Sequence, residues 1–345
     1  MLPIPLTEAT AHRVATPRSL IRLRLALRVV RLGPLLILAI LVAAFALTQP
    51  TFISERNVQN VIVQSSLIAA IALGELLVII TKGIDLSVGS VMALSTVMGV
   101  VAFHDLGWAP PLVILVILAT GAVVGTINAV VYVKGRAPHP FVVTLAMMGI
   151  ARGLALIISD GQPVSGMPQA VQTAGAGYLG PVPVPGLIVL GFAAVLWFFT
   201  TRQVWGRWIY AVGGDPDAAR EVGIPVDRVI MSVYIISGLC AGLAGLLIAG
   251  RTNSGFPTAG NLAEMDAIAG VIIGGASFLG GRGSVVNAMI GAVIVGVIRN
   301  GLNIVGVNTY AQYVAVGLII LVAVQIDVLR SRIETKFQAL EGRLA

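Results

Sequence analysis

Charged residues are scarce in this sequence: Asp, Glu, Lys and Arg make up 11% of its 345 residues, whereas hydrophobic residues make up 57%. A soluble domain carries about 25% charged residues. Because a soluble protein of this length still needs a polar surface, burial of a large core does not explain the deficit. Solvation of the helices by lipid does explain it, and the mean hydropathy of +0.97 agrees. The composition therefore predicts a polytopic membrane protein.

Residue types that often carry chemistry are also few. The single cysteine, Cys240, excludes an intramolecular disulfide and is expected to be a small packing residue in an apolar run. The three histidines fall in predicted loops or in the N-terminal segment. The apolar runs contain no metal-ligand motif, no Ser/His pairing and no carboxylate dyad. A membrane-embedded enzyme is therefore not favoured, and we expect no catalytic residue and no metal site.

The sequence also lacks a nucleotide-binding motif in a suitable context. No G-x-x-x-x-G-K-[ST] phosphate loop is present, so the chain is not expected to hydrolyse ATP or to bind a cofactor by itself. Residues 175–180 match G-x-G-x-x-G, but they lie in a proline-rich segment with no preceding strand. The motif indicates a dinucleotide site only between a strand and a helix, so we reject it here.

Long apolar runs fill most of the chain, and a spanning helix needs roughly 20 such residues. We predict an all-α bundle of about ten transmembrane helices, at residues 34–48, 58–80, 86–103, 110–133, 141–158, 186–201, 229–249, 266–281, 285–305 and 309–327. Glycines are dense around 81–90 and 276–286. Broken or re-entrant helices are expected there, where protein or a cavity has to cover the backbone.

Lys and Arg are concentrated on one side of the predicted helices. With a cytoplasmic N-terminus, 18 of the 22 basic residues fall in cytoplasmic segments, and only Arg56 and Arg251 fall in outer loops. The positive-inside rule therefore predicts that both termini are cytoplasmic, and it explains the net charge of +7 without nucleic acid. The expected organisation is a basic N-terminal segment 1–33, one transmembrane domain 34–328 with an outer loop 159–185 and a cytoplasmic loop 202–228, and a cytoplasmic tail 329–345.

The cytoplasmic loop contains a clear signal for a short helix. Asp215 is expected to cap the helix, Pro216 to occupy its first position, and Gly223 to end it. Ala218 and Ala219 would then leave a smooth surface that a groove in a partner protein can approach closely. On these features alone, a well-capped turn without a partner remains an equal alternative.

A resemblance to a known family decides between these readings. Residues 217–223, Asp-Ala-Ala-Arg-Glu-Val-Gly, resemble the EAA-x-x-x-G coupling motif of ABC importer permeases, with Asp in place of Glu. Several further stretches are similar to the branch of ribose and related monosaccharide permeases: 83–90, 140–145, 206–207, 211–214, 265–268, 274–284 and 300–303. Lys82 and His139 depart from the pattern of that branch, and neither interrupts a motif. The resemblance covers roughly residues 55–330.

The resemblance implies a permease subunit that imports a monosaccharide or related small polyol by alternating access across a bacterial inner membrane. The implied partners are cytoplasmic ABC ATPase subunits that bind ATP and Mg, a second permease subunit that is identical or paralogous, and an extracytoplasmic sugar-binding protein. That binding protein is expected to touch 159–185 and 250–265. The residues implied in ATPase coupling are Arg207, Asp215, Asp217, Ala218, Ala219, Arg220 and Gly223. Replacing Ala219 with Arg is expected to leave the protein inserted but to uncouple ATP hydrolysis from uptake.

Polar residues at or near the predicted spans are the candidates for a translocation path. A charge at mid-bilayer costs at least roughly 2.5–3.5 kcal/mol, so such residues usually face a cavity or a partner. The candidates are Glu75, Asp85, Ser87, Asn128, Thr144, Asp266, Asn300 and Asn303. For Asp85 the favoured alternative is capping of the third span, and for Asn128 and Asn303 the alternative is hydrogen bonding between helices. Arg152 and Arg299 are expected to pair with carboxylates or to lie near an interface.

Glycines four residues apart predict tight helix packing, within the bundle or at a dimer seam, at residues 121/125, 238/242 and 270/274.

The alternative function is an ion- or proton-coupled secondary transporter of a small polar solute, which favours a carboxylate pair at mid-membrane and repeated halves. Glu75 is a lone candidate for such a carboxylate, and no clear repeat is visible.

Overall fold

The structure is a computed structural model that describes residues 17–341, with side chains described for residues 32–328. Most of this part of the chain is helical. The helices are α1 (Pro17–Thr48), η1 (Pro50–Ile53), α2 (Glu55–Ile80), α3 (Val88–His104), α4 (Pro110–Val133), α5 (Pro140–Ile158), α6 (Gln169–Ala176), α7 (Val184–Arg202), α8 (Val204–Gly214), α9 (Pro216–Glu221), α10 (Val226–Thr252), α11 (Ala263–Ile273), α12 (Val285–Ile304) and α13 (Thr309–Glu341). The short strands are β1 (Val164–Ser165), β2 (Tyr178–Leu179), β3 (Val182–Pro183) and β4 (Ser254–Gly255).

The predicted all-α membrane fold is confirmed, with one predicted span wrong. In the described part of the chain, seven helices are long and apolar enough to cross a membrane: α2, α4, α5, α7, α10, α12 and residues 309–328 of α13. Residues 32–48 of α1 and all of α3 are shorter apolar helices. The predicted span 266–281 does not exist, because α11 ends at Ile273. Its 11 residues rise only about 16 Å, roughly half of the hydrocarbon core.

The glycine-rich stretches break the helices as expected. Residues 81–87 separate α2 from α3, and residues 274–284 separate α11 from α12. The second break contains Gly275, Gly280 and Gly281, all with φ in the left-handed region that favours glycine. The predicted span 266–281 extended into this break because the prediction rested on hydropathy, and glycine and its apolar neighbours do not interrupt the apolar run.

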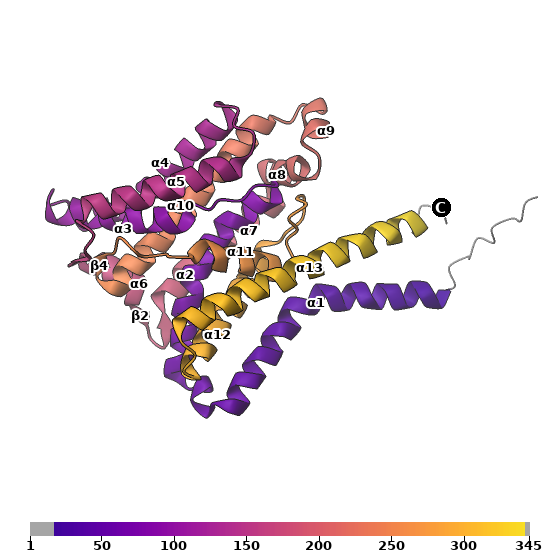
Figure 1. The fold of residues 1–345 in the computed structure, drawn as a ribbon, viewed down its shortest axis with the longest axis horizontal. Coiled ribbons are helices and arrows are strands. Elements are labelled where there is room, and N and C mark those ends of the chain that lie inside the picture. Colours follow the sequence, from indigo (N-terminus) through magenta and orange to yellow (C-terminus); the bar gives the residue numbers. More distant parts are fainter. Residues whose placement is uncertain (1–16, 342–345) are drawn as a thin grey trace, which may run out of the picture.

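The helices differ strongly in how much of their surface the protein covers. In the most apolar stretch of α2, 83% of the residues are buried inside the protein, against 11% in α13. In Figure 1, α2 runs through the middle of the molecule, whereas α1 and α13 lean away from the other helices on one side. α1 contains Pro34 within the helix, and proline removes an internal hydrogen bond and commonly bends a helix there.

α4 and α10 cross at the predicted glycine pairs. A Cβ atom on Gly121 would run into the backbone of Gly238 and Gly242, and one on Gly125 would run into the carbonyl oxygen of Tyr234. Only hydrogen at these positions allows the two backbones to approach so closely. The residue pair 270/274 likewise packs against the backbone of α12. All three spacings therefore serve packing within the bundle.

At one end of the molecule, two segments far apart in the sequence are joined. β1 pairs with β4 in an antiparallel register that places Val164 opposite Gly255. The side-chain Oδ1 of Asn253 also accepts a hydrogen bond from the backbone N–H of Met167 at 2.8 Å. The loops 159–185 and 250–265 therefore share one face of the protein, although α7, α8, α9 and α10 separate them in the sequence.

Candidate functional site

The predicted coupling segment forms the short helix α9 with the expected ends. The Asp215 carboxylate accepts hydrogen bonds from the backbone N–H groups of Asp217 and Ala218 at 2.9 and 3.1 Å, so its role as N-cap is confirmed. Pro216 occupies the first position. Gly223 has a φ of 84°, the left-handed conformation that commonly ends a helix. The whole α8–α9 corner projects from the bundle (Figure 1).

The two alanines of α9 face opposite ways, which corrects one expectation. Ala218 is exposed, but Ala219 is only 4% exposed and packs in the core. A large residue at position 219 would disturb folding, so Ala219→Arg does not test coupling and Ala218 is the position to use. Val222, which the sequence argument did not single out, is an apolar side chain that is 76% exposed at the tip. Ala218 and Val222 together expose apolar surface at the tip, which a partner protein can cover.

Charged residues surround this tip. Arg220 pairs with Asp217 at 3.2 Å and with Asp227 at 3.8 Å. These side chains are more than half exposed, so the pairs contribute at most about 1 kcal/mol to stability. Arg207 is also exposed on α8. The charged groups therefore remain accessible to a partner protein.

A three-way junction connects α8 to the bundle. The backbone N–H of Gly281 donates to the carbonyl oxygen of Ile80 at 2.8 Å. The Nζ of Lys82 donates to the carbonyl oxygen of Gly214 at 3.0 Å. A Cβ atom on Gly213 would run into both Ile80 and Gly281. The end of α2, the end of α8 and the break before α12 are thus packed backbone against backbone.

Tyr210 adds a side-chain contact to this junction. Its hydroxyl donates to the carbonyl oxygen of Gly283 at 3.1 Å. Burial raises the pKa of Tyr210, while a hydrogen bond with Thr200 acts in the opposite sense. The hydroxyl therefore keeps its proton at neutral pH and remains a donor, which ties α8 to the segment 274–284.

Four of the predicted path residues meet in one fully buried cluster beside the junction. The Asp85 carboxylate accepts from the hydroxyl of Ser87 at 2.6 Å and from its backbone N–H at 3.1 Å. The Nδ2 of Asn128 donates to the Ser87 hydroxyl at 3.0 Å. The Oε1 of Glu75 accepts from the Asp85 N–H at 3.2 Å. Ser237 of α10, which the sequence argument missed, donates to the second Asp85 oxygen at 2.9 Å.

The start of α3 lies in this cluster and lacks the expected side-chain cap. Ser87 stands at the N-cap position, but its side chain makes no bond to the helix, and Asp85 instead accepts from the Ser87 N–H. Thr144 of α5 supports the same loop by donating its hydroxyl to the carbonyl oxygen of Ile84 at 3.1 Å. Residues from α2, α4, α5 and α10 therefore fix the break between α2 and α3.

The other predicted path residues lie along α11 and α12. Arg299 donates to the Asp266 carboxylate at 2.7 Å, so the expected pairing with a carboxylate is confirmed for Arg299. Asn300 exchanges two hydrogen bonds of 3.0 Å with Asn57 of α2. The Oδ1 of Asn303 accepts from Gln312 of α13 at 2.7 Å.

Arg152 binds backbone carbonyl groups, whereas Arg299 binds a carboxylate. Its guanidinium donates to the carbonyl oxygens of Pro257 and Ala259 at 2.6 and 2.9 Å. These carbonyls belong to the loop between β4 and α11. Arg152 therefore ties α5 to the loop that shares a face with residues 159–185.

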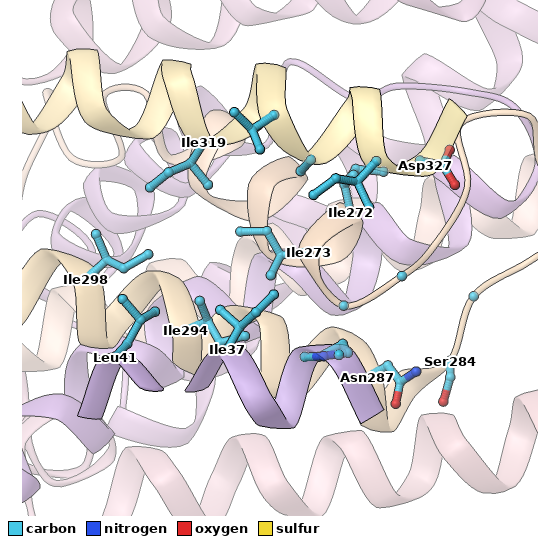
Figure 2. A pocket seen from close by; sticks show the side chains of 18 of the residues that line it. Ile37, Leu41, Ile272, Ile273, Ser284, Asn287, Ile294, Ile298, Ile319 and Asp327 are labelled. Carbon is cyan, nitrogen blue, oxygen red and sulfur yellow. The ribbon is translucent and has the colours of Figure 1, made fainter. Parts of the chain in front are cut away.

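A cavity of about 1280 Å³ lies between α1, α11, α12 and α13. Figure 2 shows isoleucine and leucine side chains along most of it and the polar groups of Ser284, Asn287 and Asp327 gathered at one end. None of the eight predicted path residues lines this cavity. Its apolar wall does not suit a hydroxyl-rich solute, so it is distinct from the candidate polar path.

Among residues 32–328, no group of three or more His, Cys, Asp and Glu side chains is placed to hold a metal ion. The described site consists of buried helices, the corner formed by α8 and α9, and the junction that joins them. Polar side chains buried inside a multi-pass helical bundle, together with an exposed capped helix, are the features that a membrane transport subunit of the permease class requires.

The comparisons with known proteins agree with this class. Residues 57–324 match the family described as "Branched-chain amino acid transport system / permease component". The ribose import permease protein RbsC of Bacillus subtilis is 41% identical over 299 residues, covering 86% of this chain and 92% of that protein. The D-allose transport system permease protein AlsC of Escherichia coli is 42% identical over 304 residues, covering 87% and 92%. The fructose import permease protein FrcC of Rhizobium meliloti is 37% identical, covering 85% and 84%. No solved structure matches the chain.

The chain therefore belongs to this family of ABC importer permeases. It is a transport subunit of the bacterial inner membrane and not an enzyme in its own right. Membership also implies that it works with ATPase subunits and a binding protein.

Proposed function

We propose that this permease imports a monosaccharide or related small polyol by alternating access. The similarity to permeases named for ribose, allose and fructose supports a sugar more strongly than the amino acids in the family description, because it extends over nearly the whole chain at about 40% identity. Sugars are neutral and rich in hydroxyl groups. They need amide, hydroxyl and paired charged groups along their path, and the polar residues of α11 and α12 are of these kinds.

α9 is the element that couples this movement to ATP. The observation that carries the proposal is the geometry of the corner: a capped helix of six residues that projects from the bundle and exposes Ala218 and Val222 at its tip. The docking surface consists of Arg207, Asp217, Ala218, Arg220, Val222 and Gly223, with Asp215 holding the helix start. ATP and Mg bind to the partner ATPase subunits, and this chain binds neither.

The movement passes from α9 to the bundle through the three-way junction. α8 is joined to α9 at Asp215, and the end of α8 contacts α2 and residues 274–284 through backbone groups. Because backbone atoms in such close contact cannot move past one another, a shift of α8 displaces the end of α2. Nucleotide drives the change only if the ATPase pair binds one state of the permease more tightly than the other.

The sides of the membrane follow from the basic residues. Residues 202–228 and both termini face the cytoplasm, whereas 159–185 and 250–265 face outward and receive the sugar-binding protein. The antiparallel pairing of β1 with β4 supports this docking face, because it joins the two loops into one surface. A second permease subunit, identical or paralogous, completes the transmembrane path.

The path itself runs along α11 and α12. Asn303 is exposed, and the paired side chains of Asp266 and Arg299 retain 11% and 13% exposure. Asn300 lies one turn earlier on the same helix. Glu75, Asp85, Ser87, Asn128 and Thr144 are fully buried and bonded to one another or to the loop 81–87, so they contact solute only if the bundle opens.

Site-directed cross-linking tests the coupling assignment. The only native cysteine is Cys240, which is buried, so Cys240→Ala gives a background for single cysteines. Ala218→Cys is expected to cross-link to the partner ATPase, with a yield that changes when ATP is bound. Ala176→Cys, an exposed alanine on α6 in the outer loop, is the matched control and is expected to give none. Equal yields from both positions would refute the assignment.

A further inference from the structure

The buried cluster around Glu75 and Asp85 contains two carboxylates, and several of its buried oxygen atoms form no hydrogen bond. We propose that Glu75, Asn128 and Tyr234, beside the ionised Asp85, form a binding site for one small monovalent cation at the break between α2 and α3. The inference goes beyond sugar import and does not depend on it. It rests on three observations: the charge of the cluster, the position of its unpartnered atoms, and the chemical type of those atoms.

The charge of the cluster is not balanced by any basic side chain. Glu75 and Asp85 are 0% and 1% exposed. Among the described residues, neither carboxylate forms an ion pair. Arg220 pairs with Asp217 and Asp227, and Arg299 pairs with Asp266. A buried charge without a partner is strongly unfavourable, so two carboxylates in one dry cluster require a proton or a cation as the compensating positive charge. A proton would serve Glu75 alone, whereas a cation can bind several oxygen atoms at once.

The hydrogen bonds distinguish the two carboxylates. Asp85 accepts three hydrogen bonds, two from Ser87 and one from Ser237, and this is how proteins hold an ionised carboxylate. Glu75 accepts one, at Oε1, and its Oε2 has no partner. The missing positive charge therefore belongs beside Glu75 Oε2.

Two other buried oxygen atoms beside the loop 83–87 are also unpartnered. The Oδ1 of Asn128 has no partner, although the amide nitrogen of that side chain donates to Ser87. The hydroxyl of Tyr234 has none either, and it reaches the space where a side chain on Gly83 would begin. Asn128 and Tyr234 are each 1% exposed. Both atoms thus lie against the loop 83–87 that Glu75 holds.

The ligand chemistry selects a monovalent cation. All the free atoms are oxygens, from a carboxylate, an amide and a phenol, and hard cations prefer such ligands. In the described chain, no three His, Cys, Asp or Glu side chains gather as a divalent metal site would require. One positive charge neutralises Glu75, while Asp85 remains ionised and held by its three donors. Sodium carries one positive charge and is the probe of choice.

The position of the site gives it a consequence for movement. The cluster joins α2, α4 and α10 around the loop 81–87. In the same loop, Lys82 donates a hydrogen bond to the carbonyl oxygen of Gly214 at the end of α8. A cation at Glu75 stabilises the arrangement in which these helices meet. It thereby favours one of the two states of the permease over the other.

The test uses the purified permease in detergent, without ATPase or sugar. Its Tm is measured in NaCl and in choline chloride at equal ionic strength. At sodium concentrations roughly 100 times Kd, a rise in Tm of about 5 °C is expected. Glu75→Gln and Tyr234→Phe are expected to lose this rise, and Tyr234→Phe keeps the ring that packs on Tyr132. Glu55→Gln, an exposed carboxylate on the same helix, is the matched control and keeps it.

Binding of radioactive sodium to the same samples measures the site directly, without relying on a change in Tm. The wild type and Glu55→Gln are expected to bind about one ion per chain, and Glu75→Gln none. Equal Tm in sodium, lithium, potassium and choline salts, or sodium binding retained by Glu75→Gln, would overturn the proposal; the first result would show that a proton, not a cation, neutralises Glu75. Because no transport is measured, failure here is distinguishable from failure of the proposed sugar import.

Discussion

The backbone N–H of Gly281 donates to the carbonyl oxygen of Ile80 at 2.8 Å, across 201 positions of sequence, and Gly213 packs on both groups. This contact brings the last turn of the buried helix α2 against the corner that carries α9. Ile80 is fully buried, whereas α9 projects from the bundle. The relationship provides a direct mechanical connection between a surface helix and the interior of the permease.

Gly213→Ala tests this connection. The added methyl group would collide with backbone atoms of Ile80 and Gly281, which cannot rotate away. Overpacking of this kind costs about 1–3 kcal/mol. We expect a lower Tm and a large loss of ATP-driven uptake. Gly214→Ala is the matched control, because open space surrounds the added methyl there; a Gly213→Ala protein that transports as well as Gly214→Ala would contradict the junction.

Ala218→Arg tests docking without disturbing the fold. The side chain is exposed, and surface substitutions usually change stability by no more than about 0.5 kcal/mol. We expect an unchanged Tm of the permease alone, but loss of ATPase co-purification and of uptake. Ala176→Arg, at an exposed position of α6, serves as control and keeps both. Normal co-purification of Ala218→Arg would exclude α9 as the docking element.

The contact between α4 and α10 is expected to tolerate no side chain. Gly121→Ala would press a methyl group into the backbone of α10 and lower stability by about 1–3 kcal/mol. Gly149→Ala on α5 meets nothing within reach and removes a residue of poor helix propensity, so stability stays equal or rises. Thermal unfolding in detergent measures both. Equal Tm values for the two variants would show that α4 and α10 are not in close contact.

The Asp266–Arg299 pair is expected to behave as a coupled unit. The two groups are 2.7 Å apart and about one-tenth exposed, so removing one partner leaves a nearly buried charge and costs about 3–5 kcal/mol. Asp266→Asn and Arg299→Gln should each lower the Tm, and the double variant should recover part of the loss. Additive losses in this double-mutant cycle would show that the two side chains do not interact.

Hydropathy predicted most of the fold because it follows directly from lipid solvation. It could not predict where α11 stops, since the break at 274–284 depends on backbone conformation at glycines that are apolar by composition. The cap at Asp215 was predictable, because an N-cap bonds to residues two and three positions away. The burial of Ala219 was not, because it depends on how the corner packs against distant helices.

The buried cluster was predictable only in part. Glu75, Asp85, Ser87 and Asn128 stood out in the sequence as polar residues in apolar runs. Ser237 and Tyr234 did not, because serine and tyrosine are common in such helices and the residues near their hydroxyl groups, Asp85 and Gly83, lie about 150 positions away in the sequence. Only the crossing of α4 and α10 brings these side chains to one point.

Uptake into proteoliposomes tests the central claim most directly. Vesicles would contain the permease with its partner ATPase, ATP and Mg in the lumen, and the partner binding protein with labelled ribose, allose or fructose outside. The account predicts uptake of at least one of these sugars that requires lumenal ATP, persists when a protonophore and an ionophore abolish ion gradients, and disappears in Ala218→Arg. Uptake that continues without ATP and follows a proton or sodium gradient would contradict it and identify a secondary transporter.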